Sequence, residues 1–411
     1  MEKERLETLN EILEELTYNL DISETDDNVI RQSYKAVGEW LSAKESPLSD
    51  FEVEIRPQGS FNLGTIIRPI NKDDDIDIDL VCELKGKKEE WTQKNVKQAV
   101  GKRLKENGTY SKMLDDEGRR CWTLLYGNHN KNDHYHMDIL PCVINPNYGR
   151  IMEDMYKKDI ITDNYNWDKA AIRITDKFRK DYSTSTDTSE WLKSNPFGYA
   201  RWFFERAKKS KVLKRTLLNE GVKSLPSKNR EIYPLQRVVQ ILKRHRDIYY
   251  GGEEDKPISI IITTLAAQAY NGEKDIYTAL TNVVKNFKNV IREEYSEEYG
   301  RVIKVISNPV NPSENFADKW PEKPNKERVF YEWLSHLTED LLSIGDKNST
   351  QLMESFGKYF GKETSYKTFK NLSDYKRSNR DKGLLGITPA GTLTTSGKIK
   401  VKPVHNFYGK D

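Results

Sequence analysis

The chain has 411 residues, of which 36% are hydrophobic and 32% are charged, and its formal net charge is +3. That length is enough for two lobes with cores of their own, and the near balance of 67 Lys and Arg against 64 Asp and Glu argues against a dedicated nucleic-acid binder. No apolar run approaches the ~20 residues of a membrane span and the N-terminus is too polar for a secretory signal, so we expect a cytoplasmic protein without a membrane partner.

Two amphipathic helices are predicted at the start of the chain. Apolar residues recur at helical spacing over residues 3–20 and again over residues 26–43. Both segments precede the first strand pattern. We expect these helices to pack against a sheet or to brace the two lobes.

A glycine-serine pair followed by alternating carboxylates is the most informative stretch of the sequence. Gly59-Ser60 is followed by Asp75, Asp77 and Asp79, with isoleucine or leucine at the positions between and after them. Side chains on a strand alternate between faces, so the three carboxylates would project together. Like charges crowded on one face repel one another unless a cation lies between them. The expected cation is Mg²⁺, which takes oxygen ligands from one or two carboxylates and from substrate phosphates.

The alternative interpretation of this stretch is an acidic turn that leads into an edge strand. It suits residues 73–75, because Asn-Lys-Asp-Asp-Asp is ordinary turn chemistry. It does not suit Asp77 and Asp79, which lie inside an apolar-alternating run. Gly59-Ser60 alone could be a plain turn. Beside carboxylates it predicts a phosphate cradle, since glycine lets backbone N–H groups approach phosphate oxygens and the serine hydroxyl can donate as well.

A second polar strand face is predicted further along the chain. After a polar helix over residues 89–106, strands are expected at residues 121–126 and 134–143. In the second of these strands His134, His136 and Asp138 share one face. Asp138 could be a capping or edge residue of a strand, but its place on the polar face of an otherwise apolar strand favours a catalytic role.

A dinuclear zinc site of the metallo-beta-lactamase kind is the competing interpretation of these residues. That motif wants a histidine directly after the aspartate, where Ile139 stands instead. The two histidines are therefore interpreted as a strand-face pair near the site. The cysteines, Cys82, Cys121 and Cys142, are odd in number and widely spaced, so we expect buried thiols instead of disulfides or a zinc ribbon.

These motifs resemble the signature of the polymerase-beta-type nucleotidyltransferase superfamily. Within it they resemble the CD-NTase family, the cyclic-oligonucleotide synthases of bacterial anti-phage systems. The resemblance implies that Gly59-Ser60 grips a triphosphate, that Asp77 and Asp79 bind two Mg²⁺ ions, and that Asp138 completes the site, with Mn²⁺ as a substitute metal. The resemblance selects Asp77 and Asp79 as the metal-binding pair over Asp75 and Asp77. In the family, apolar residues follow the second carboxylate, as Leu80-Val81 do here.

Beyond residue 160 the strand signals fade and helices are predicted. One begins at Ser194-Asn195-Pro196, an N-cap followed by proline, and is basic at its end over residues 208–215. Further basic residues follow in a polar loop up to Arg230, so a basic run spans residues 208–230. The run is interpreted as a solvated face, with contact to a nucleotide or to nucleic acid as the alternative.

Two further helices are predicted at residues 233–250 and from Ser259 to Ala267. The resemblance implies that Lys243 and Ser259 contact the donor nucleotide. From the residues alone, Lys243 could equally be a lysine that reaches along the surface to solvent, and Ser259 could be only an N-cap.

Helical patterns resume at residues 327–344 and 350–359 after a proline-punctuated loop, and a polar tail is expected from about residue 375. The resemblance implies a bilobed α+β fold, with a small mixed catalytic sheet flanked by helices and a C-terminal helical lobe. The expected divisions are a catalytic core at 1–160, a helical nucleotide-binding lobe at 161–365 and a tail at 366–411.

The function implied by the resemblance is synthesis of a cyclic di- or trinucleotide second messenger from nucleoside triphosphates, ATP and GTP among them, in anti-phage defence. Its expected partners are these substrates and accessory defence proteins. The zinc-binding thumb of the animal DNA sensor in this superfamily has no counterpart in the sequence, so direct activation by DNA is not implied. A nucleotidyltransferase that tails RNA or modifies a protein is the alternative, supported by the basic run. A non-catalytic nucleotide-binding module is disfavoured by the intact carboxylates.

Overall fold

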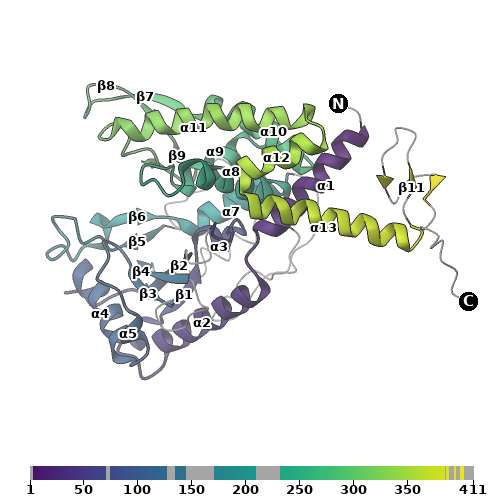
Figure 1. The fold of residues 1–411 in the computed structure, drawn as a ribbon. Coiled ribbons are helices and arrows are strands. Elements are labelled where there is room, and N and C mark those ends of the chain that lie inside the picture. Colours follow the sequence, from purple (N-terminus) through teal and green to yellow (C-terminus); the bar gives the residue numbers. More distant parts are fainter. Residues whose placement is uncertain are drawn as a thin grey trace, which may run out of the picture.

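The protein is described by a computed structural model with two lobes, one built on a sheet and one built of helices (Figure 1). The described residues are 3–70, 75–126, 135–144, 171–209, 232–384, 386–387, 393–394 and 399–401. Separate clusters of buried apolar side chains fill the two lobes. The α+β fold class predicted from the sequence is confirmed.

A six-stranded mixed sheet forms the base of the first lobe. Its strands are β1 (Glu54–Pro57), β2 (Ile76–Lys85), β3 (Trp122–Leu125), β4 (Tyr135–Ile144), β5 (Ile172–Ile174) and β6 (Leu192–Ser194). They are ordered β1-β2-β4-β5-β6. β3 pairs with residues 136–139 of β4, ahead of the residues that pair with β5. β2 and β4 run parallel, whereas the other pairings are antiparallel. The predicted strands at 121–126 and 134–143 are thereby confirmed.

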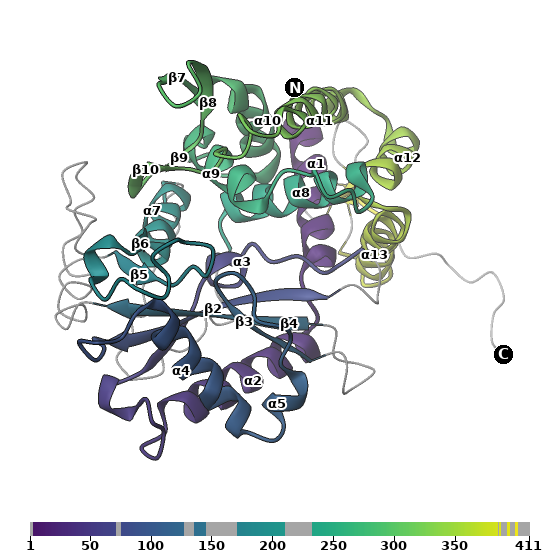
Figure 2. The same cartoon turned by 90° about the vertical axis from the view of Figure 1, so that its left-hand side faces the viewer.

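Three helices cover one face of this sheet (Figure 2). They are α2 (Glu24–Ser42), α4 (Gln93–Glu106) and α5 (Tyr110–Met113). Their apolar stripes pack with the isoleucines and leucines of β2 that alternate with its carboxylates. The carboxylate face of β2 therefore points away from these helices, toward the helical lobe.

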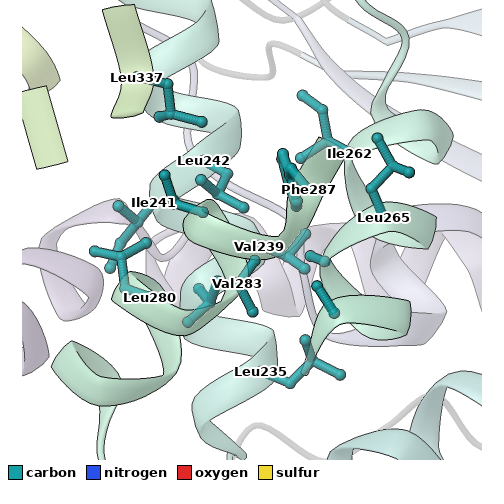
Figure 3. Close-up of a cluster of buried hydrophobic side chains, with 14 of the residues drawn as sticks. Leu235, Val239, Ile241, Leu242, Ile262, Leu265, Leu280, Val283, Phe287 and Leu337 are labelled. Carbon is teal, nitrogen blue, oxygen red and sulfur yellow. The ribbon is translucent and has the colours of Figure 1, made fainter. Parts of the chain in front are cut away.

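The helical lobe is organised around α8, which Figure 3 shows among its buried neighbours. Its helices are α1 (Lys3–Leu20), α7 (Pro196–Ala207), α8 (Pro234–Tyr250), α9 (Ser259–Ala269), α10 (Ile276–Asn286), α11 (Pro324–Leu342), α12 (Ser349–Phe360) and α13 (Lys362–Asp381). The predicted N-cap of α7 is confirmed, because the Asn195 side chain accepts a hydrogen bond from the Gly198 N–H at 2.9 Å.

Helix α8 differs from its sequence pattern in one respect. The pattern predicts an apolar side and a polar side, yet twelve of its 17 residues are buried. The polar side is covered because other parts of the chain pack on it and provide hydrogen-bond partners. His245, for example, is 2% exposed and lies within 3.2 Å of both Asp340 and Trp333.

The sheet continues past residue 160, where the sequence predicted that strands would give way to helices. β5 and β6 are each three residues long, too short for alternation to stand out. Helix α1 packs in the core of the helical lobe, although it precedes the six-stranded sheet in the chain. The division into segments at 160 and 365 stays a prediction.

The C-terminal part contains a helix that the sequence pattern did not indicate. Residues 366–381 belong to α13, which packs against α1 and α12. Few of its residues are buried, so the helix lacks the apolar stripe by which helices are recognised in a sequence.

The remaining strands are short and lie outside the six-stranded sheet. They are β7 (Arg292–Ser296), β8 (Arg301–Val305), β9 (Ser307–Asn308), β10 (Asn311–Asn315), β11 (Gly386–Ile387), β12 (Leu393–Thr394) and β13 (Ile399–Lys400). Within the described ranges, no helix is both long and apolar enough to cross a membrane.

Gly101 sets how closely α4 approaches the sheet, and this gives a stability prediction. A Cβ atom at Gly101 would lie 2.2 Å from the Trp122 ring. Gly101→Ala should therefore destabilise the fold by about 1 to 3 kcal/mol through overpacking, although alanine is ordinarily favoured in a helix by about 1 kcal/mol. Urea unfolding measures the effect. Gly108→Ala is the control, because no atom lies within 4 Å of a Cβ there. A Gly101→Ala protein as stable as wild type would contradict the prediction.

Candidate active site

Strands β2 and β4 bring the predicted carboxylates onto one face of the sheet. The parallel register places Asp79 opposite Asp138 and Asp77 opposite His136. On the antiparallel side of β4, Thr123 is the partner of Asp138, and its hydroxyl donates to Asp138 Oδ1 at 2.5 Å. The side chains in the core-facing positions between them are buried. The strand order alone therefore collects three carboxylates from two segments of the chain.

His136 is hydrogen-bonded to Asp77. Its Nε2 lies 2.8 Å from Asp77 Oδ1, and its Nδ1 lies 3.8 Å from Asp75 Oδ2. The hydrogen bond to Asp77 raises the pKa of His136 to about 9 and lowers the pKa of Asp77. An imidazolium therefore neutralises part of the acidic face. His134, predicted to share this face, lies outside the described residues.

Asp79 is the carboxylate in the most unfavourable environment. Burial is the main reason that its pKa rises to about 6, and the nearby charges of Asp138 and Asp77 raise it further. An ionised side chain at this position needs positive charge beside it.

The donor set of this face fits Mg²⁺ only together with a phosphate ligand. Among the described residues, no three His, Cys, Asp or Glu side chains form a ready-made metal cage. Mg²⁺ is ordinarily held by one or two carboxylates plus substrate phosphates, so a complete protein cage is not required. The crowded, partly buried carboxylates of β2 and β4 are consistent with that mode of binding.

The glycine-serine turn lies directly against Asp79. The turn opens a short helix, α3 (Gly59–Leu63), immediately after β1, and the Gln58 N–H donates to the Asp79 carbonyl at 2.9 Å. Gly59 has a φ of +60°, and a Cβ atom there would lie 2.1 Å from Asp79 Oδ2. Only glycine fits this position, both for its backbone conformation and for the space available. The predicted phosphate cradle and the carboxylates are thus neighbours.

Lys243 faces the same region from the helical lobe. It is 6% exposed, and its Nζ donates to the Thr65 carbonyl at 3.0 Å, a few residues after the turn. Burial lowers its pKa to about 8, the charge of Arg246 lowers it further, and the carboxylates of Asp77 and Asp79 act in the opposite direction. The alternative of a lysine reaching to solvent is therefore wrong.

Ser259 is less directly connected to the site. It is the first residue of α9 and is not the N-cap, which is Ile258. Its hydroxyl accepts a hydrogen bond from Arg246 Nη1 at 3.0 Å, so it is joined to α8 just beyond Lys243. No contact links it to the carboxylates among the described residues. Most of the basic run at 208–230 lies outside the described residues.

Two polar residues at the site were not singled out by the sequence. Thr123 holds Asp138, but only the strand register reveals that pairing. Gln236 on α8 donates to the Leu63 carbonyl at the end of α3 at 2.7 Å. A glutamine in the first turn of a helix carries no signal for such a long-range contact.

The raised pKa of Asp79 gives a stability prediction for the metal-free protein. Its folded-state pKa lies above the ordinary value of 3.8, so ionisation destabilises the fold as the pH rises from about 4 through 6. Asp79→Asn should therefore stabilise the metal-free protein at pH 7.5 by about 1 to 3 kcal/mol, with the gain vanishing near pH 4. Thermal unfolding in EDTA across this pH range measures the effect.

Asp77→Asn is the control of opposite sign. The pKa of Asp77 is lowered, so its ionised form stabilises the fold, and its replacement should lower the unfolding midpoint at pH 7.5. Equal shifts in the same direction for both variants would contradict the raised pKa of the buried Asp79 as the cause.

Comparison with known proteins agrees with this geometry. A family model described as the Second Messenger Oligonucleotide or Dinucleotide Synthetase domain matches residues 8–170. The chain is 28% identical over 409 residues to a c-di-GMP synthase of Roseivirga ehrenbergii. This match covers 98% of this chain and 97% of the relative. It is 23% identical over 372 residues to the cyclic dinucleotide synthase CdnG of Bradyrhizobium diazoefficiens, covering 86% of this chain and 80% of that protein.

Solved structures share the fold. The Bradyrhizobium diazoefficiens CD-NTase CdnG, solved in complex with GTP, superposes with a TM-score of 0.60 at 18% identity, covering 89% of this chain and 99% of that one. The Vibrio cholerae cyclic AMP-GMP synthase DncV superposes with a TM-score of 0.51 at 14% identity, covering 86% of this chain and 80% of that one. The domain match, the relatives of matching length and the shared fold agree: residues 8–170 match a Second Messenger Oligonucleotide or Dinucleotide Synthetase domain, and the chain as a whole is similar in sequence to cyclic dinucleotide synthases and in fold to the CD-NTase CdnG.

Proposed function

We propose that this chain is a cyclic dinucleotide synthase that uses GTP and joins two nucleotides through two phosphodiester bonds. The observation that carries the proposal is the convergence of Asp79 and Asp138 on neighbouring parallel strands, with Gly59 directly against Asp79. The similarity to a c-di-GMP synthase over nearly the whole length of both chains supports a dinucleotide product made from GTP.

The proposed roles of the residues follow from their positions. Gly59 and Ser60 offer backbone N–H groups and a hydroxyl to the β- and γ-phosphates. Asp77, Asp79 and Asp138 would hold two Mg²⁺ ions, which supply charge neutralisation for the triphosphate and lower the pKa of the attacking ribose hydroxyl. Lys243 would provide positive charge to the triphosphate from the helical lobe, and Ser259 is a further proposed contact to the donor nucleotide.

The chemistry balances as two nucleotidyl transfers. In each step the ribose hydroxyl oxygen of the acceptor forms a bond to the α-phosphorus of the donor, and the bond from that phosphorus to the bridging oxygen of the β-phosphate breaks. Pyrophosphate leaves and one proton is released. Two steps between two nucleoside triphosphates close a ring and release two pyrophosphates.

The experiment incubates the purified chain with each labelled nucleoside triphosphate, singly and in pairs, in the presence of Mg²⁺ or Mn²⁺. Phosphatase treatment then leaves only products without a terminal phosphate, and nuclease digestion identifies the linkages. A resistant dinucleotide formed from GTP without added macromolecules supports the proposal. Absence of any product from free nucleotides would overturn it.

Transfer to RNA or to a protein is the alternative, and the basic run at 208–230 is its support. A product that forms only on added RNA, together with RNA binding that weakens steeply as the salt concentration rises, would favour this alternative. For the cellular role we propose bacterial anti-phage defence, with accessory defence proteins as partners, tested by phage challenge of cells that carry the wild-type or the Asp77→Asn gene.

A further inference from the structure

One face of α8 captures the backbone that connects the phosphate turn to the carboxylate strand. We call residues 63–68 the connecting segment; it begins at the last residue of α3 and leads toward β2. Four of its carbonyl oxygens accept hydrogen bonds from side chains of α8: Leu63 from Gln236 at 2.7 Å, Thr65 from Lys243 at 3.0 Å, Ile66 from Gln240 at 2.9 Å and Arg68 from Arg244 at 2.5 Å.

The four donors are placed by helical geometry. Gln236, Gln240, Lys243 and Arg244 follow one another at spacings of four, three and one, so they lie along one face of α8. All four are buried, with exposed fractions between 1% and 6%. Buried polar groups of this kind are stabilising only when their hydrogen bonds are made, so this face specifies the position of the connecting segment.

Gln236 is the donor nearest to the phosphate turn, and its amide is fixed at both ends. The Nε2 donates to the Leu63 carbonyl, and the Oε1 accepts from the Tyr233 N–H at 2.8 Å. The backbone approaches it very closely, because a Cβ atom on Gly64 would lie 2.6 Å from Nε2. Gly64 has a φ of +65°, so this position favours glycine on both counts.

The connecting segment in turn holds the phosphate turn. The Thr65 N–H donates to the Ser60 carbonyl at 3.0 Å, which closes the short helix back on its first turn. Displacement of Leu63 or Gly64 would therefore shift Ser60, whose neighbour Gly59 lies against Asp79. The path from Gln236 to the turn runs through the Leu63 carbonyl, the backbone of residues 63–65 and the hydrogen bond from Thr65 to Ser60.

We infer that Gln236 is a positioning residue, which holds the Gly59-Ser60 turn of the sheet lobe in register with Lys243 of the helical lobe around the phosphates of the donor nucleotide. This inference rests on the proposed function. It assigns to the helical lobe a part in placing the phosphates through the backbone of the other lobe, in addition to the direct contact proposed for Lys243.

The test replaces Gln236 with methionine, which has a similar volume and cannot form these hydrogen bonds. Because a displacement of about 1 Å in a phosphate-binding group can lower the rate about 100-fold, we expect kcat for dinucleotide formation to fall about 10- to 100-fold. The KM for GTP should change less than about five-fold, since the defect lies in orientation and not in uniform binding. Rates are expressed per folded molecule.

His245→Leu is the matched control for the structural effect. His245 lies on the same helix, is also 2% exposed and also has two hydrogen-bond partners, but they are Asp340 and Trp333, away from the turn. Both variants should lower the unfolding midpoint, whereas only Gln236→Met should lower kcat. Equal kcat per folded molecule in the two variants would overturn the inference and leave Gln236 a structural residue. A wild-type protein without activity would instead overturn the proposed function.

A second variant approaches the same contact from the other side. Gly64→Ala pushes a methyl group against the Gln236 amide, and its kcat should fall in the same way. Combining it with Gln236→Ala, which makes room for that methyl group, should give a smaller loss than the sum of the two single changes. Strict additivity would contradict a shared contact. These three variants also test the inference if the Gln236→Met protein does not fold.

Discussion

Replacing Asp77 and Asp79 together with asparagine is expected to lower the rate of phosphodiester formation by about 10³-fold or more. Asparagine keeps the shape of each side chain but removes the negative charge that a divalent cation requires. The two positions are separated by one residue on β2, so their side chains share the face that also carries Asp138. Labelled phosphatase-resistant product formed per minute measures the effect, and thermal unfolding shows whether the variant is folded.

Asp75→Asn is the matched control for this prediction. Asp75 precedes β2, its side chain is 40% exposed, and it ends 3.8 Å from His136. Because the metal is assigned to Asp77 and Asp79, Asp75→Asn should stay within about three-fold of wild-type activity, as an exposed substitution usually does. A loss as large as that of the double variant would place Asp75 in the metal site and contradict the assignment.

Gly59→Ala is expected to lower activity by about 100-fold or more, the second of the large effects. The added methyl group would lie 2.1 Å from Asp79 Oδ2, so either the carboxylate or the turn must move. Both are assigned to the same triphosphate, and a displacement of about 1 Å at a reacting centre can account for a loss of this size. Initial rates at saturating GTP measure it, because the defect should persist when the nucleotide is bound.

Gly86→Ala separates backbone strain from this steric effect. Gly86 also has a positive φ, of +87°, but no atom lies within 4 Å of a Cβ there. Alanine should strain the backbone at either position by roughly 1 to 2 kcal/mol. Only Gly59→Ala should lose activity when both are compared at a temperature where they are folded. Similar activities of the two variants would refute the close packing of the turn on Asp79.

The carboxylate face of the sheet could be predicted from the sequence because it depends on local periodicity. Alternation in β2 and β4 fixes which side chains point the same way, and the turn composition at Gly59-Ser60 marks the end of β1. Periodicity did not show that β2 and β4 are adjacent and parallel, since pairing is a property of two distant segments. The family resemblance provided that link for Asp138.

Contacts that depend on the second lobe could not be predicted in the same way. The polar side of α8 has the composition of a solvated helix face, and only its burial against the connecting segment reveals that Lys243 points toward the site. The strands β5 and β6 are too short for alternation to stand out, and the polar helix α13 has few buried residues, so neither shows a strong pattern. Tertiary packing decides these elements, and a single sequence records it weakly.

The position of α1 has a consequence for the synthesis of this protein on the ribosome. The apolar stripe of α1 packs with α8 and α10, and Asn10 bonds to Asp275, so these partners emerge long after the helix itself. At ~5–20 residues per second, roughly 10 to 45 s separate the end of α1 from the start of α8. During that time the sheet lobe can begin to fold while the N-terminal helix waits with its leucines exposed. Nascent chains halted before residue 234 should therefore be the ones most dependent on chaperones.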